Sequence, residues 1–179
     1  MRKELQLTAI SICTVSLILV GLSNYANAAA YLKFDGIDGE VSARGHDAWI
    51  NVLSISHSIS RGAESSATAR SSGMASFSDI TVTKEMDKSS PKLAEAVASG
   101  RMIPNVAFEL TSNSGTYLKY ELKNVMVTSY SMSGNASDRP MESISLNFEE
   151  IKVTYTEFSP DGKAKGNVEY SWKVEEGTK

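Results

Sequence analysis

The stretch "MESISLNFEEIKVTYTEF", residues 141–158, carries the pattern that decides the fold. Every second residue is apolar in two consecutive runs, namely Ile144, Leu146 and Phe148, then Ile151, Val153 and Tyr155. This period of two is typical of a β-strand with one buried face. The alternation moves by one residue at Glu149-Glu150. A bulge supplies one such extra residue and bends the strand, so we expect a long, strongly curved strand here.

The preceding segment "YLKYELKNVMVTSYSM", residues 117–132, has the same feature. Its apolar positions shift phase near Lys123-Asn124, from Leu118, Tyr120 and Leu122 to Val125 and Val127. Two strands of about 16 residues, each with a phase change, predict a sheet that curves on itself.

Three shorter segments also alternate, and turn residues separate the predicted strands. The segments are "WINVLSISHSI" (49–59), "IPNVAFELT" (103–111) and "VEYSWKV" (168–174). Their predicted buried faces are Trp49, Leu53, Ile55, His57 and Ile59; Val106, Phe108 and Leu110; and Val168, Tyr170, Trp172 and Val174. Turns are expected at Asn113-Ser114-Gly115, Ser133-Gly134-Asn135 and Pro160-Asp161-Gly162.

The segment "DKSSPKLAEAVASG", residues 87–100, predicts the one helix. Ser90 suits the N-cap, Pro91 the first position, and Gly100 the end. Its narrow apolar stripe consists of Leu93, Ala94, Val97 and Ala98. So short a helix is marginal alone and must dock on the sheet. The predicted fold is mainly β, a curved antiparallel two-sheet barrel or sandwich with one short docked α-helix.

Between two predicted strands lies "SRGAESSATARSSGMA", residues 60–75, which is rich in Ser, Ala and Gly. It carries almost no apolar bulk and cannot contribute much to a core. Loops of this length in a compact domain are usually functional or disordered. We therefore interpret it as a long hairpin excursion.

The N-terminus departs from the rest of the chain. Arg2 and Lys3 precede an almost uncharged run up to Leu22, followed by Ala26-Asn27-Ala28. A cationic start, an apolar middle and an A-x-A site are typical of a secretory leader. A membrane anchor and a buried first helix are the alternatives, but polar residues dilute the run. We expect cleavage after Ala28, at a site formed by Ala26, Ala28 and Ala29. This gives a leader of residues 1–28 and a mature domain of residues 29–179 with no stable membrane insertion.

The sequence contains no recognisable catalytic constellation. The chain has two histidines; His57 falls on an apolar face, which predicts a packed, hydrogen-bonded ring, and His46 lies in a polar turn, which predicts a solvated one. The segment "DGIDGE" (35–40) does not match a calcium loop and is interpreted as a tight turn. No nucleophile elbow or phosphate loop occurs. We expect no enzyme, cofactor or metal.

Charge argues against one further class of partner. The net charge is −3, and basic and acidic residues are interspersed. A nucleic-acid interface needs a basic patch, so no nucleic-acid partner is expected. The one cysteine, Cys13, lies in the predicted leader, so the mature chain would contain no disulfide.

Four segments in this order resemble the haemolysin-coregulated protein (Hcp) family, the tube subunit of the bacterial type VI secretion system. They are "YLKFDGIDGE" with "WINVLSISHSISRG"; "ASFSDITVTKEMDKSSPKLAEAVASG"; "YLKYELKNVMVTSYSMSG"; and "MESISLNFEEIKVTY" with "VEYSW". The resemblance implies a curved two-sheet barrel with one docked helix. It also implies hexameric rings that stack into a hollow tube carrying effectors, in contact with other type VI secretion components.

The resemblance further implies that the long hairpin takes part in contacts between stacked rings. In this chain the candidate assembly residues are Ser60, Arg61, Gly62, Glu64, Arg70, Ser72 and Gly73. Small residues permit close approach of two chains, and the two arginines can pair with acidic side chains of a neighbouring subunit. Tube subunits of the family ordinarily lack a leader. The alternative is therefore an exported periplasmic or secreted relative that acts as a binding or surface protein and does not build a tube.

Overall fold

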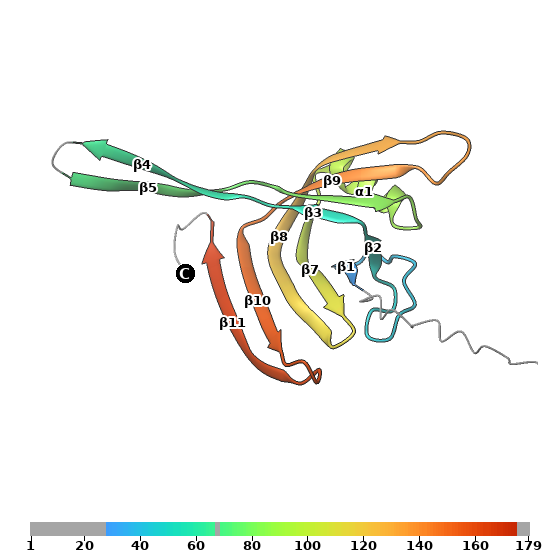
Figure 1. Ribbon diagram of the computed structural model, residues 1–179. Helices are drawn as coiled ribbons and strands as arrows, with labels where there is room; N and C mark the ends of the chain where they lie inside the picture. Colours follow the sequence, from blue (N-terminus) through green and yellow to red (C-terminus); the bar gives the residue numbers. More distant parts are fainter. Residues whose placement is uncertain (1–27, 67–68, 175–179) are drawn as a thin grey trace, which may run out of the picture.

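The computed structural model describes residues 28–66 and 69–174. The fold is mainly β with one short helix, as predicted (Figure 1). Its elements are β1 (Ala29–Phe34), β2 (Ile50–Val52), β3 (Ser54–Ser56), β4 (Ile59–Ser66), β5 (Ala69–Phe77), β6 (Ile80–Glu85), α1 (Ser90–Ser99), β7 (Met102–Ser112), β8 (Gly115–Ser133), β9 (Met141–Asn147), β10 (Glu150–Phe158) and β11 (Ala164–Lys173).

One antiparallel sheet of nine strands forms the body. Its main path runs β2-β1-β7-β8-β9-β6-β3; β10 also pairs with β8, and β11 pairs with β10. The strands at the two ends of the path, β2 and β3, follow each other in the chain and are separated only by Leu53. The sheet therefore curves into two facing layers. It is a curved sandwich and not a closed barrel, so of the two predicted architectures the sandwich is correct.

The curvature is concentrated where the two predicted phase changes meet. One edge of β8 pairs with β10 as far as Lys123↔Glu150 and with β9 from Met126↔Asn147 onward. Between these pairings Asn124 adopts a φ of 49°, and the Glu149 amide donates to the Lys123 carbonyl at 3.1 Å. Asparagine tolerates this left-handed conformation better than most residues. We call these four residues, Lys123, Asn124, Glu149 and Glu150, the hinge.

At the hinge, one sequence prediction is wrong and another is confirmed. Residues 141–158 are not one bulged strand but two, β9 and β10, because β8 exchanges one partner for the other at this point. On β8 the phase does shift as predicted, since Leu122 and Val125 are both buried on either side of Asn124. The side chains of Asn124 and Glu149 are hydrogen-bonded, and Lys123 Nζ lies 2.7 Å from Glu150 Oε2.

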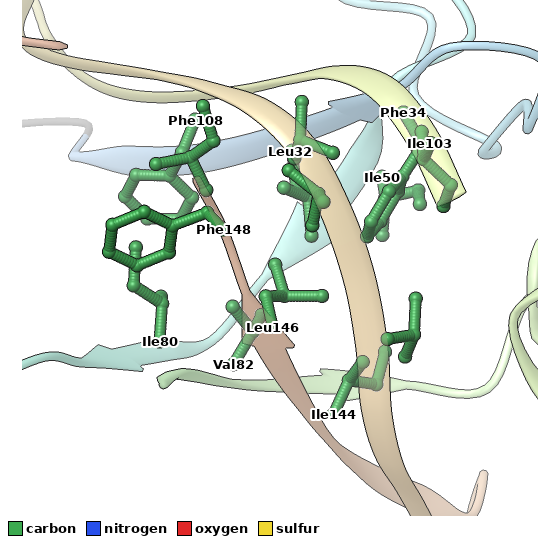
Figure 2. Packing of buried hydrophobic residues seen from close by; sticks show 14 of the residues in the cluster. Leu32, Phe34, Ile50, Ile80, Val82, Ile103, Phe108, Ile144, Leu146 and Phe148 are labelled. Atoms are coloured by element: carbon green, nitrogen blue, oxygen red, sulfur yellow. The ribbon is translucent and has the colours of Figure 1, made fainter. Parts of the chain in front are cut away.

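The core lies between the two layers. Figure 2 shows side chains of β1, β2 and β7 meeting those of β6 and β9. The labelled residues are Leu32, Phe34, Ile50, Ile80, Val82, Ile103, Phe108, Ile144, Leu146 and Phe148, all buried. Burial of each such side chain contributes about 1.5–3 kcal/mol to folding. The alternation predicted for β7 and β9 is therefore confirmed.

Two predicted buried faces are wrong in part. In the first, Ile50 and Val52 are buried while Leu53 is 52% exposed, because the chain crosses from β1 to β6 at that residue and the alternation changes phase there. Ile59, also predicted to be buried, is 49% exposed at the start of β4. In β11, Val168 is 75% and Tyr170 40% exposed, since none of the described strands or helices covers that end of the sheet.

The helix forms where predicted, with two differences of detail. Pro91 lies in the first turn, and Gly100 ends the helix with a φ of 64°. The buried apolar residues are Leu93 and Ala96, whereas Ala98 is exposed. The residue at the N-cap position is Ser89, and Ser90 is the first residue of α1. The predicted cap residue thus has another role.

Ser90 belongs to a buried polar network that holds α1 on the sheet. Lys84 of β6 is fully buried, and its Nζ lies 2.7 Å from Glu142 Oε2 of β9 and 2.9 Å from Asp87 Oδ1. Lys84 also donates to Ser90 Oγ at 3.1 Å, and that hydroxyl donates to Glu142 at 2.9 Å. Tyr130 of β8 donates to the second oxygen of Glu142. Burial, followed by the Glu142 carboxylate, raises the pKa of Tyr130 to about 12.

We expect Glu142→Gln to destabilise the fold by about 3 kcal/mol, because it removes one of the carboxylates that neutralise a buried ammonium group. The measurement is urea unfolding. The matched control is Glu95→Gln on the exposed face of α1, which removes the pairing partner of Lys92. Exposed pairs add little, so the control should unfold like wild type. Equal midpoints for the Glu142 variant and wild type would contradict the assigned role of the network.

Candidate functional site

The predicted hairpin excursion is a two-stranded ribbon made of β4 and β5, residues 59–66 and 69–77. The two strands pair with each other and with no other described strand. Figure 1 shows the ribbon projecting away from the sandwich as a long arm. The excursion is therefore a hairpin, as predicted, but strands take up most of its length.

The seven candidate assembly residues divide between the two strands of the ribbon. Ser60, Arg61, Gly62 and Glu64 lie on β4, and Arg70, Ser72 and Gly73 lie on β5. Ser60, Arg61 and Gly62 are exposed. For residues 63–66 and 69–73 the structure describes the backbone pairing, which continues to Ser66↔Ala69.

The glycines of the ribbon fall at a register shift. Arg61 pairs with Ala75, but Ala63 pairs with Ser72, so β5 carries one residue more than β4 between these pairs. Gly62 stands opposite Gly73-Met74 at this bulge. Bulges increase the local twist, and glycine accepts the required backbone conformations readily.

The base of the ribbon is joined to the sandwich by hydrogen bonds and by aromatic rings. The Ser78 amide donates to the Ser58 carbonyl at 3.0 Å, and the Ser58 amide donates to Ser78 Oγ at 3.0 Å. Phe77, the last residue of β5, stacks on Trp172 with ring centroids 6.2 Å apart and meets Phe148 edge-on at 6.3 Å. The His57 ring also contacts Phe77 and Phe148, so it takes part in the same attachment of the ribbon to the sandwich.

His57 is packed as predicted, but the predicted hydrogen bond is absent at one nitrogen. Its ring lies 5.8 Å from that of Phe148, 6.2 Å from Phe77 and 6.3 Å from Tyr120. Nε2 is buried and has no hydrogen-bond partner among the described residues. Burial lowers the pKa of His57.

The prediction for His46 is wrong. Its Nε2 lies 2.9 Å from Glu109 Oε2 on β7, and its ring stacks on Tyr31 with centroids 4.2 Å apart. The contact fastens the loop before β2 to the sheet. The carboxylate of Glu109 also accepts a hydrogen bond from Thr116 at 3.0 Å. No local signal could reveal this partner, which is 63 residues away in the chain.

A second exposed surface lies on β10 and β11, at the end of the sheet. β11 pairs only with β10 among the described strands, so its other edge is open. Beside that edge are three large side chains: Val168 (75% exposed), Tyr155 (50%) and Tyr170 (40%). Tyr155 pairs with Val168, and Tyr170 lies two residues further along β11 on the same face. We call these three residues the edge patch.

The opposite face of the same strands is polar and carries paired charges. Lys152 of β10 lies 3.0 Å from Glu169 of β11, and Lys119 and Glu121 of β8 are 3.0 Å apart. This polar face is hollowed by an open concavity of about 690 Å³. The residues that line it include Asn105, Ala107, Glu121, Lys123, Glu150, Lys152, Ser171 and Lys173.

Other predicted positions fall as follows. The segment 35–40 forms the expected tight turn, with Gly36 at a φ of 77° and Ile37 bridging back to Phe34. Ala28 directly precedes β1, Ala29 is its first residue, and Ala26 lies outside the described residues with the rest of the predicted leader.

Within residues 28–66 and 69–174, no three His, Cys, Asp or Glu side chains are grouped to hold a metal ion. In the same part of the chain, no helix is long and apolar enough to cross a membrane.

The described residues form a curved sandwich with one docked helix, a projecting ribbon and an open sheet edge. The family model for the type VI secretion system effector Hcp matches residues 31–155. The chain belongs to this Hcp family, and its predicted family resemblance is confirmed.

Individual relatives support the assignment. The chain is 36% identical over 102 residues to protein hcp1 of Pseudomonas aeruginosa, a match that covers 54% of this chain and 63% of that protein. A solved structure of a type six secretion system protein matches with 30% identity and a TM-score of 0.79, covering 84% of this chain and 98% of that one. Hcp1 from Salmonella typhimurium matches with 26% identity and a TM-score of 0.71, covering 84% and 97%.

Proposed function

We propose that the chain is a structural tube subunit of a type VI secretion system, which forms hexameric rings that stack into a hollow tube. The observation that carries this proposal is the Hcp family match together with two exposed features of the fold, the ribbon and the open β11 edge. The role is structural and requires no catalytic group.

Ring closure requires a head-to-tail interface, in which one surface of a subunit meets a different surface of the next. The edge patch suits one side of such an interface, because Tyr155, Val168 and Tyr170 are exposed together beside unpaired backbone groups. An uncovered strand edge with an apolar face is a template for pairing with another chain. A neighbouring subunit that adds to this edge would satisfy the backbone and bury the patch.

Ring stacking fits the ribbon. It extends away from the core, so it can reach a neighbour without disturbing the sandwich, and its bulge carries Gly62 and Gly73. Small residues permit close backbone approach, and Arg61 and Arg70 suit acids of the next ring.

The channel wall is assigned to the polar face of β7, β8, β10 and β11. This face is concave, and its charges are paired across strands, as in Lys152–Glu169 and Lys123–Glu150. A hollowed surface with balanced charge can contact effectors of varied composition without holding them tightly. Effectors and other secretion components are the partners proposed for the tube.

The alternative is that the chain is an exported Hcp-fold protein, which acts as a binding or surface protein and does not build a tube. The observation that favours it is the leader pattern of residues 1–28, directly before the first residue of β1. Cleavage after Ala28 would leave β1 complete, including the pairing Ala29↔Thr111. Such a protein would act in the periplasm or outside the cell.

We expect Val168→Asp to shift the purified protein from rings to smaller species, because it places a charge in the edge patch. The measurement is light scattering at tens of micromolar protein. Asn167→Asp is the matched control, because it introduces the same charge on the opposite face of β11. Unchanged ring assembly in the Val168 variant, or equal loss in both variants, would exclude the edge patch as the closing surface.

We expect a shortened ribbon, with residues 63–73 replaced by a two-residue Asn-Gly turn, to form rings that no longer stack. The ribbon adds little to the core, so the urea midpoint should match that of wild type. Electron microscopy distinguishes single rings from tubes. Tubes as long as those of wild type would contradict a stacking role, and a large drop in the midpoint would show that the ribbon supports the fold.

We expect the protein recovered from fractionated cells to begin at Ala29. The measurement is N-terminal sequencing, with Ala26→Leu and Ala28→Leu as variants that place large residues at the A-x-A site and so block cleavage. Recovery of an intact Met1 terminus from the cytoplasm would refute the leader and with it the exported alternative.

A further inference from the structure

His57 occupies an unusual position at the base of the ribbon. It lies between β3 and β4, two residues before Ile59, where the chain leaves the sandwich. Its ring meets Phe77 from the end of β5, Phe148 from the segment after β9, and Tyr120 from β8. The imidazole therefore bridges both strands of the ribbon to both layers of the body.

The surroundings of His57 offer Nε2 no hydrogen-bond acceptor and no acidic partner among the described residues. This atom is buried without a hydrogen-bond partner, and of the three rings that contact His57 only the phenol of Tyr120 can titrate. Burial raises the pKa of that phenol, so it is neutral wherever His57 titrates. On β11, burial likewise raises the pKa of Tyr170.

The acidic residues next to the contacting rings have other partners. Glu121, next to Tyr120, lies 3.0 Å from Lys119. Asp79, two residues after Phe77, bonds Thr128 at 2.6 Å and Asn147 at 2.9 Å. Glu149, next to Phe148, bonds Asn124 at the hinge. Protonated imidazole would thus be an unpaired charge in a partly buried site whose Nε2 is enclosed, which costs free energy unless the ring moves into water.

The ribbon is attached to the sandwich near its base. Its strands pair only with each other among the described strands, and its attachment includes the Ser58–Ser78 hydrogen bonds and the ring contacts of Phe77 and His57. Elements with few buried contacts open locally before the whole fold unfolds.

We propose that the base of the ribbon is a pH-sensitive joint, in which protonation of His57 releases Phe77 and the ribbon from the sandwich while the sandwich stays folded. The device lies within one chain, so it holds whether or not the protein builds a tube.

The direction of the pH effect follows from burial. Because burial lowers the pKa of His57 in the folded state below that of an unfolded histidine, about 6.5, the closed joint prefers neutral imidazole. The joint is fully stable above about pH 6.5. Its stability falls as the pH drops from there through the folded-state pKa.

The test is hydrogen–deuterium exchange of the full-length protein between pH 7.5 and pH 5, corrected for intrinsic exchange rates. We expect peptides at the ribbon base, around residues 59–61 and 75–77, to exchange about three- to tenfold faster at the acidic end, and peptides of β9 to be unchanged. Light scattering at each pH verifies that the oligomeric state is constant across the series.

Two variants isolate the group responsible. His57→Phe keeps an aromatic ring without a titrating nitrogen, so its ribbon exchange should be independent of pH. His46→Gln, which changes the other histidine, should respond like wild type. An unchanged wild-type ribbon, an equal acid response in His57→Phe, or parallel loss of protection in β9 would each overturn the proposal. The wild-type series decides the question even if a variant folds poorly.

Discussion

The exchange of partners along one edge of β8 is the constraint on which the rest of the structure depends. A strand of 19 residues cannot stay flat against both β10 and β9 while keeping its apolar side chains in one core. Asn124 resolves this by taking a left-handed φ, which shifts the side-chain alternation by one residue. Glu149 is hydrogen-bonded to the Asn124 side chain and to the Lys123 carbonyl. The end of β9 and the start of β10 therefore both lie beside Lys123 and Asn124 of β8. The two layers of the sandwich separate there.

The layers are then held by two kinds of contact with different energetic character. Apolar residues of β1, β2 and β7 pack on those of β6 and β9, which provides most of the free energy of folding. The Lys84, Glu142 and Ser90 network instead fixes where α1 sits, since buried charges need their partners in place. The network lies on the same side of the hinge as β9. The network therefore connects α1 to β9, the strand that ends at the hinge.

The surfaces assigned to assembly are those that this core leaves uncovered. The sheet has an open end at β11, where Val168 and Tyr155 remain exposed, and the ribbon leaves the body at the joint formed by His57 and Phe77. The first surface continues the main sheet. The second is attached to the body near its base, where the proposed protonation of His57 would change its position.

The sequence by itself determined the mainly β fold, the helix, the turns and the position of both phase changes, because periods of two and 3.6 and glycine or proline signals are local properties. It also placed the ribbon, through the lack of apolar bulk in residues 60–75. Only the tertiary structure decided that 141–158 is two strands and that Leu53 is exposed, since both depend on which strands are neighbours. The same holds for the pairing of His46 with Glu109 and for the unpartnered nitrogen of His57. Contacts between residues far apart in the chain leave no local periodicity to read.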